Sequence, residues 1–123
     1  MSVESPLRRI LNEMVRVEGV NAALVISKDG FAIDFVVSGG AEIDPESIAA
    51  MLVTIHGAVK RFGEEFNLGK VELVTAEYEK GKVLLADIED AIVVLITEKD
   101  ALLGRVRFEL KRQKDRIQAA LGT

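Results

Sequence analysis

The chain has 123 residues, of which 49% are hydrophobic and 29% are charged, and its formal net charge is −4. This length suits one domain with a single core over residues 1–123, and the composition is that of a globular protein, not a disordered one. The acidic balance of 16 Lys and Arg against 20 Asp and Glu argues against a dedicated nucleic-acid-binding protein. The absence of cysteine excludes disulfides, thiol catalysis and zinc–thiolate sites.

The N-terminal sequence MSVESPLRR lacks the apolar segment of a signal peptide. No uninterrupted apolar run approaches the roughly 20 residues that a membrane span requires. The missing cysteines also fit a reducing compartment. We therefore expect a soluble, cytoplasmic protein.

The first third of the chain predicts a helix followed by a β-hairpin. Ser5 and Pro6 are typical of a helix start, and the helix carries an apolar stripe made of Leu7, Ile10, Leu11, Met14 and Val15. Residues 20–27 are apolar on both faces, as in a central strand. The turn at Gly30 then leads into a second strand over residues 31–37.

A long helix is expected next, with Asp44 as its N-cap, Pro45 at its first position and a C-cap at Asn67. Its apolar residues recur at three- and four-residue steps and predict a stripe that faces the core, formed by Ile48, Met51, Leu52, Ile55, Val59, Phe62 and Phe66. A glycine inside a helix costs about 1 kcal/mol relative to alanine. Gly57, on the other face, therefore suggests the close approach of a second helix, although a glycine tolerated on a solvated face is the alternative.

Three further strands and a final helix complete the chain. Residues 71–78 mix polar and apolar side chains, as near a sheet edge; residues 83–88 form the next strand; residues 91–97 are apolar on both faces and predict a central strand. The last helix has an apolar stripe made of Leu103, Val106, Leu110, Ile117 and Leu121. The order α-β-β-α-β-β-β-α predicts an α+β sandwich with a five-stranded antiparallel sheet in the order 2-1-5-4-3 and helices on both faces.

The strand at residues 71–78 lies at an edge of this sheet, where unpaired backbone groups favour pairing with another chain. Pairing with its own copy about a two-fold axis would bring two long helices side by side, the arrangement that Gly57 also favours. The sequence therefore predicts a homodimer.

Three segments carry a resemblance to a known family. They read VEGVNAALVISKDGFAIDF, then GEEFNLGKVELVTAEYEKGKVLLADI after the long helix, and finally AIVVLITEKDALLGRVRFELKRQ. Together with the element order, they resemble the Roadblock/dynein light chain family, which includes MglB-type regulators, over about residues 7–117. The hairpin with SKDG and the segment ALLGRVRFEL are the most diagnostic parts.

The resemblance implies a profilin- or longin-like sandwich that dimerises through its second helix and third strand. It also implies a platform for small Ras-like GTPases, or a non-catalytic subunit of a motor or signalling scaffold. Carried onto this sequence, the dimer interface would contain Ala49, Ala50, Val53, Thr54, Gly57, Val71, Leu73 and Thr75. The surface that binds the GTPase or another partner would contain His56, Lys60, Arg61 and Glu64.

No catalytic constellation is found in the sequence. His56 is the one histidine, and a lone histidine on a helix is more often a packed or interface residue than a base or a metal ligand. Gly39-Gly40 lacks the lysine and the spacing of a phosphate-binding loop. Asp87, Glu89 and Asp90 indicate a solvated acidic turn, with calcium binding as the less favoured alternative because no EF-hand pattern is present. We therefore expect no enzyme activity, no metal and no cofactor.

The last helix is strongly basic, with Arg105, Arg107, Lys111, Arg112, Lys114 and Arg116 against Glu109 and Asp115. A solvated face is the preferred interpretation. The alternative joins these residues to Arg8, Arg9 and Arg16 as a basic surface for anionic lipid, nucleic acid or an acidic partner. Phe108 lies off the apolar stripe and is either a partner contact or packed against a loop.

The leading hypothesis is a homodimeric, non-catalytic adaptor that binds a small Ras-like GTPase and modulates its nucleotide cycle, as a GAP-like regulator or as a scaffold. The alternative is a structural, light-chain-like subunit of a motor or signalling assembly that has no effect on GTP turnover. No nucleic-acid partner is expected, and membrane contact is considered only through the basic face.

Overall fold

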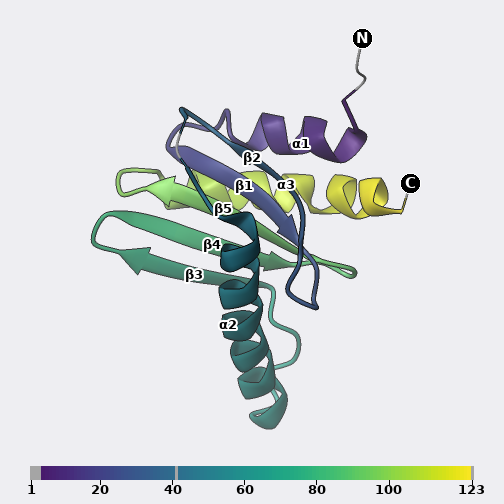
Figure 1. Ribbon diagram of the computed structural model, residues 1–123. Coiled ribbons are helices and arrows are strands. Elements are labelled where there is room, and N and C mark those ends of the chain that lie inside the picture. Colours follow the sequence, from purple (N-terminus) through teal and green to yellow (C-terminus); the bar gives the residue numbers. More distant parts are fainter. Residues whose placement is uncertain (1–3, 41, 123) are drawn as a thin grey trace.

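A computed structural model describes residues 4–40 and 42–122 (Figure 1). Its elements follow the predicted order: α1 (Pro6–Met14), β1 (Val20–Ile26), β2 (Ala32–Val37), α2 (Pro45–Glu65), β3 (Leu73–Tyr78), β4 (Gly81–Asp87), β5 (Ile92–Glu98) and α3 (Leu103–Leu121). The predicted α+β class is confirmed, and the largest boundary differences are shifts of two or three residues at element ends.

The five strands form one antiparallel sheet in the order β2-β1-β5-β4-β3, as predicted. The central strands β1 and β5 are buried along almost their whole length. Their side chains are apolar on both faces because successive residues of a strand point to opposite sides, and helices cover both sides here. The outer strands, β2 and β3, are more exposed.

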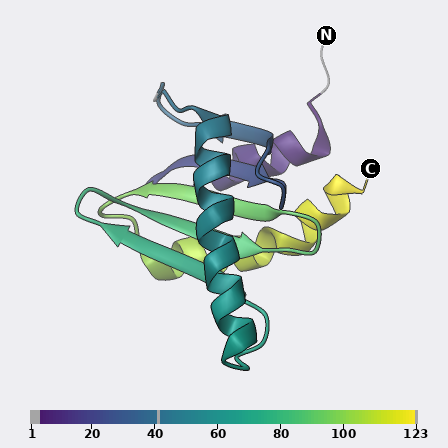
Figure 2. The same ribbon diagram turned by 60° about the horizontal axis from the view of Figure 1, so that its bottom comes forward.

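The helices occupy opposite faces of the sheet. α1 and α3 lie side by side on one face, and α2 crosses the strands on the other (Figures 1 and 2). The chain has a hydrophobic core on each face of the sheet, and alternate residues of β5 contribute to each. Val93 and Leu95 pack against α1 and α3, whereas Ile92 and Val94 face α2. The C-terminal part of α2 continues beyond β3, so that it extends past the edge of the sheet (Figure 1).

A buried polar network joins α1 to α3. Gln113 is fully buried, and its Nε2 donates to Glu13 Oε2 at 3.1 Å and to Glu109 Oε1 at 2.9 Å. Its Oε1 accepts a hydrogen bond from Arg116 Nη1 at 2.8 Å. Burial alone would raise the pKa of Glu109, but hydrogen bonds from Arg112 and Gln113 more than offset it and lower that pKa. The predicted apolar stripe of α3 is therefore interrupted by two buried polar residues.

The predicted helix ends are confirmed. The side chain of Ser5 accepts from the Arg8 N–H at 3.1 Å, and that of Asp44 accepts from the Ser47 N–H at 3.3 Å. At the end of α2, Asn67 has a φ of 57°, and the chain closes with a hydrogen bond of 2.8 Å from the Leu68 N–H to the carbonyl of Gly63. This pattern is a Schellman cap, which satisfies free carbonyls of the last helical turn.

Candidate functional site

The orientation of α2 differs from the one that its apolar pattern predicts. The buried residues of α2 are small or polar, namely Ala49, His56 and Gly63. Ile48 and Leu52 pack partly against the core below α2. The prediction that the rest of the stripe faces the core is wrong, since these side chains are exposed: Met51, Ile55, Val59, Phe62 and Phe66. The physical reason is that small side chains let the helix approach the sheet closely, and the sheet ends at β3 before the helix does.

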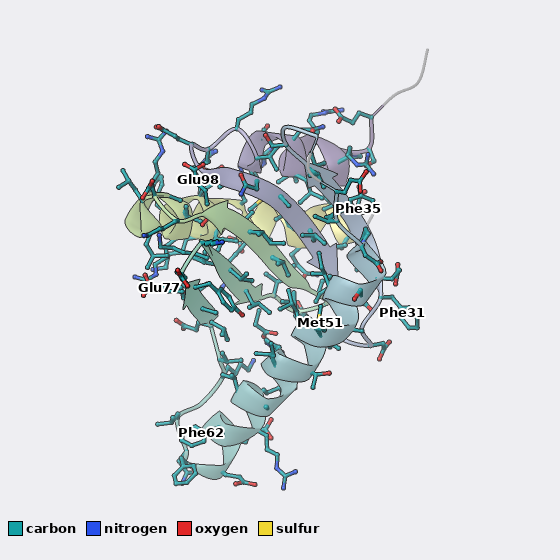
Figure 3. All side chains as sticks on the ribbon, turned by 60° about the vertical axis from the view of Figure 1, so that its left-hand side comes forward. Phe31, Phe35, Met51, Phe62, Glu77 and Glu98 are labelled. Atoms are coloured by element: carbon teal, nitrogen blue, oxygen red, sulfur yellow. The ribbon has the colours of Figure 1, made fainter. Side chains whose placement is uncertain are left out.

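We call these five exposed residues the apolar flank of α2. Phe62 is 57% exposed, and its ring stacks on that of Phe66 with 4.6 Å between centroids. Figure 3 shows Met51 on the part of α2 above the sheet and Phe62 on the part that extends past β3. A contiguous row of large apolar side chains on the surface of a folded protein marks an interaction site.

The residues predicted for the dimer interface are split between the core and the surface. Ala49 is fully buried against the sheet and Val53 is half-buried, so that Ala49 has no side-chain surface to offer a partner. The three others on α2 are exposed on a side of the helix that adjoins the apolar flank at Met51, namely Ala50, Thr54 and Gly57. The three near the sheet edge are half-buried, namely Val71, Leu73 and Thr75, of which Val71 precedes β3.

The residues predicted to face a partner are likewise divided. Lys60, Arg61 and Glu64 are exposed on the outer half of α2. The Arg61 guanidinium pairs with Glu65 at 3.1 Å, a surface ion pair one helical turn away. Lys60 and Glu64 border an open hollow of about 960 Å³ that lies between the end of α2, the β4–β5 turn and α3.

His56 is buried, with 4% of its surface exposed, and is therefore not available to a partner. Its Nε2 lies 3.1 Å from Asp87 Oδ1, which is also 3.1 Å from Lys28 Nζ. The two buried atoms of His56 and Asp87 are not aligned as a hydrogen bond and have no other hydrogen-bond partner among the described residues. Burial is the main cause that lowers the pKa of His56, and the Asp87 charge opposes it only in part.

The depressed pKa of His56 predicts a pH-dependent stability. The unfolded chain takes up a proton near the ordinary value of 6.5 while the folded chain stays neutral, so the free energy of unfolding should fall as the pH drops below 6.5 towards the folded-state pKa. Because the chain has one histidine, a His56→Leu variant should lose this slope. Denaturant unfolding between about pH 7.5 and 5.5 measures it. An equal slope in both proteins would contradict this assignment.

The acidic turn between β4 and β5 has protein partners. Asp87 faces His56 and Lys28, and the Asp90 carboxylate accepts from Gln118 Nε2 at 2.6 Å. Within residues 4–40 and 42–122, no three His, Asp or Glu side chains come together as metal ligands. In the same part of the chain, no helix is long and apolar enough to cross a membrane.

The fold and this surface define a small α+β sandwich whose most prominent functional feature is an apolar helix flank beside an open sheet edge. The family model for the Roadblock/LC7 domain matches residues 7–97, and the chain belongs to this family. Three uncharacterized proteins of Methanocaldococcus jannaschii are 36%, 34% and 33% identical to it, over 95%, 90% and 90% of this chain and 98%, 96% and 96% of theirs.

Solved structures share the whole fold at low sequence identity. Myxococcus xanthus MglB has a TM-score of 0.88 at 15% identity and covers 98% of both chains. The gliding protein MglB of Thermus thermophilus has a TM-score of 0.85 at 20% identity, over 98% of this chain and 93% of its own. Acanthamoeba castellanii profilin IA has a TM-score of 0.60 at 15% identity, over 90% and 96%, which confirms the profilin-like architecture.

Sequence reasoning named α2 as the functional helix but missed its apolar flank as a surface. The apolar pattern could not reveal this, because the seven large apolar residues fall within an arc of about 100°, the ordinary width of a helix stripe that faces a core. The small residues Ala49 and Gly63 mark the buried side of α2. Ala49 packs against the sheet, and Gly63 approaches the loop that follows α2: a Cβ atom at Gly63 would lie 3.0 Å from the carbonyl oxygen of Gly69.

Proposed function

We propose that the chain forms a homodimer through α2 and β3 and that the dimer is a non-catalytic adaptor for a small Ras-like GTPase, whose nucleotide cycle it modulates. The observation that carries the proposal is the apolar flank of α2, which extends beyond the edge of its own sheet. A second copy is the partner that can cover it and fill the open edge at the same time.

The dimer follows from the position of β3. This strand pairs with β4 on one side and lies at the edge of the sheet, so one row of its backbone groups has no strand partner within the chain. Antiparallel pairing of β3 with its copy would give one continuous ten-stranded sheet. The protruding part of each α2 would then lie over the sheet of the partner subunit, with the apolar flanks in contact.

The GTPase assignment rests on family membership and on the exposed charged residues of α2. Lys60, Arg61 and Glu64 stay accessible beside the proposed dimer contact, and Lys60 and Glu64 border the hollow of about 960 Å³. A charged, hollowed surface on a rigid helix suits recognition of a polar protein partner, in which charges set orientation and association rate. MglB, with which the chain shares its fold, is described as a gliding protein in Thermus thermophilus.

The test is single-turnover GTP hydrolysis by a Ras-like GTPase from the same genome, with and without this protein. A changed rate, or binding that depends on whether GTP or GDP is loaded, supports the proposal. The double variant Lys60→Glu/Arg61→Glu should weaken that binding, whereas Lys80→Glu in the β3–β4 turn should not. Binding without any effect on turnover would favour the alternative, a structural light-chain-like subunit. Absence of binding in both nucleotide states would contradict the GTPase assignment.

Any acceleration of GTP hydrolysis should come from ordering of the switch loops of the GTPase, and this chain should donate no arginine finger. Arg61 is the most suitable donor by position, because its side chain is highly exposed on the outer half of α2. We expect Arg61→Ala to retain acceleration. Loss of all acceleration with binding and fold intact would show that Arg61 takes part in the chemistry.

A further inference from the structure

The charges of this chain are strongly segregated. Residues 6–16 and 103–121, which contain α1 and α3, hold nine of the 16 Lys and Arg but only three of the 20 Asp and Glu. They carry a net charge of +6, and the remainder of the chain therefore carries −10. Since α1 and α3 lie side by side on the face of the sheet opposite α2, we call them the basic layer (Figure 1).

The acidic groups of the basic layer are mostly neutralised within it. Glu13 accepts from Arg116 at 2.7 Å, and Glu109 accepts from Arg112 at 2.9 Å, both around the buried Gln113. Asp115 is the remaining acid, and it is exposed on α3. Arg8 pairs with Asp34 of β2. Among the described residues, no ion pair engages the six other cations of the layer, which are Arg9, Arg16, Arg105, Arg107, Lys111 and Lys114.

An aromatic side chain projects from the middle of these cations. Phe108 is 65% exposed on the outer face of α3. Its neighbours three and four residues away on the helix surface include Arg105, Lys111 and Arg112. Leu102, just before α3, is also largely exposed. An apolar side chain ringed by cations is the pattern of a protein surface that lies on anionic lipid, because the cations meet the headgroups while the aromatic enters the interface.

We propose that the basic layer is a docking surface for anionic membranes, with Phe108 as the group that inserts between lipids. Charge complementarity supplies the attraction. The exposed phenyl ring favours a bilayer over a nucleic acid or an acidic polypeptide, since only the bilayer offers an apolar layer beneath its charges. This inference does not depend on the GTPase assignment, because Arg107, Phe108 and Lys111, which are exposed on α3, do not line the hollow beside α2.

The proposed dimer would strengthen this contact. Two copies of β3 that pair antiparallel in one sheet are related by a two-fold axis perpendicular to that sheet. This rotation keeps each face of the sheet on its own side, so both basic layers lie on the same side. Two linked surfaces then bind with higher avidity than one. The α2 helices would stay on the other side, facing away from the membrane. A monomeric variant should bind vesicles more weakly yet keep the same preference for anionic lipid.

The test is sedimentation with phosphatidylcholine vesicles, with or without a third of phosphatidylserine, at about 0.1 M and about 0.5 M salt. We expect at least about tenfold stronger binding to the anionic vesicles at low salt, and loss of that binding at high salt. Arg107→Glu/Lys111→Glu should lower binding about tenfold or more. The control Lys70→Glu/Lys80→Glu changes the net charge equally, at exposed positions outside the basic layer, and should bind like the unaltered protein. Equal loss in both variants, or no lipid preference, would overturn the proposal.

Phe108 gives a second, independent measurement. The chain has no tryptophan, so Phe108→Trp introduces a single tryptophan at the proposed insertion point, and its emission can be excited apart from that of Tyr78. Its emission should shift to the blue with anionic vesicles and stay unchanged with duplex DNA or polyglutamate. A blue shift with vesicles supports insertion. An emission that does not change with vesicles would contradict the proposal. Tighter binding to DNA or polyglutamate than to vesicles would also contradict it and would assign the basic layer to another partner.

Discussion

Phe62→Glu is expected to convert the proposed homodimer into a monomer, with a mass near 13.4 kDa in place of twice that value. Phe62 belongs to the apolar flank and lies on the part of α2 that extends past β3 (Figure 3). A carboxylate buried there would lose its water without gaining a partner, and the apolar contact of the ring would also be lost. Together these should weaken self-association at least about 100-fold, or roughly 2.8 kcal/mol. Light scattering over a dilution series measures this change.

Two control variants make this result specific. Phe108→Glu places the same charge on a similarly exposed phenylalanine of α3 and should leave the dimer intact. Gly57→Leu tests the other exposed side of α2, where a Cβ atom would meet nothing within 4 Å in the single chain. A monomer caused by Gly57→Leu but not by Phe62→Glu would move the dimer contact to the side of Ala50 and Thr54. Unchanged association in both would contradict a dimer through α2.

Leu95→Ala should cost about 3–4 kcal/mol of unfolding free energy. Leu95 is fully buried in the middle of β5, on the face covered by α1 and α3, where its truncation leaves a cavity that neighbouring strands on both sides cannot close. Proteins of this size have a total unfolding free energy of about 5–15 kcal/mol, so the loss is a large fraction of the total. Urea denaturation followed by far-ultraviolet circular dichroism should show a lower midpoint with an unchanged slope.

Leu102→Ala is the matched control for this experiment, because it removes the same atoms from a side chain that is largely exposed. It should change the unfolding free energy by no more than about 0.5 kcal/mol. Both variants should be measured at the same protein concentration, since a dimer gains stability by mass action. Equal effects of the two substitutions would contradict the position of β5 at the centre of the core.

The strand order could be predicted because two strands carry an unambiguous signal. Residues 20–26 and 92–97 are apolar on both faces, which is tolerated only where helices cover both sides of a sheet. Short turns then force antiparallel neighbours and leave the strand at residues 73–78 at an edge. The helix caps at Ser5 and Asp44 were equally readable, because such caps depend on side chains within one turn of the helix.

The burial of the polar groups could not be predicted from the sequence in the same way. Gln113 and Glu109 look like ordinary residues of a solvated helix face, and their burial depends on Glu13, a hundred residues away from Gln113. His56 is likewise buried because Asp87 and the sheet lie beneath it. A polar side chain is tolerated in the interior only when distant groups satisfy or balance it, and a local pattern does not contain those groups.

The sequence by itself determined which segments are helices and strands, how the strands are ordered and which family the chain resembles, because these depend on local periodicity, turns and caps. Only the tertiary structure decided which side of α2 meets the sheet. The periodicity indicates that Met51, Ile55 and Phe62 gain free energy by burial, but it does not say against what. A contact with the same chain and a contact with a second one would bury them equally well. The length of α2 relative to the width of the sheet favours the second possibility, which is the contact that we propose, because the helix continues where its own sheet has ended.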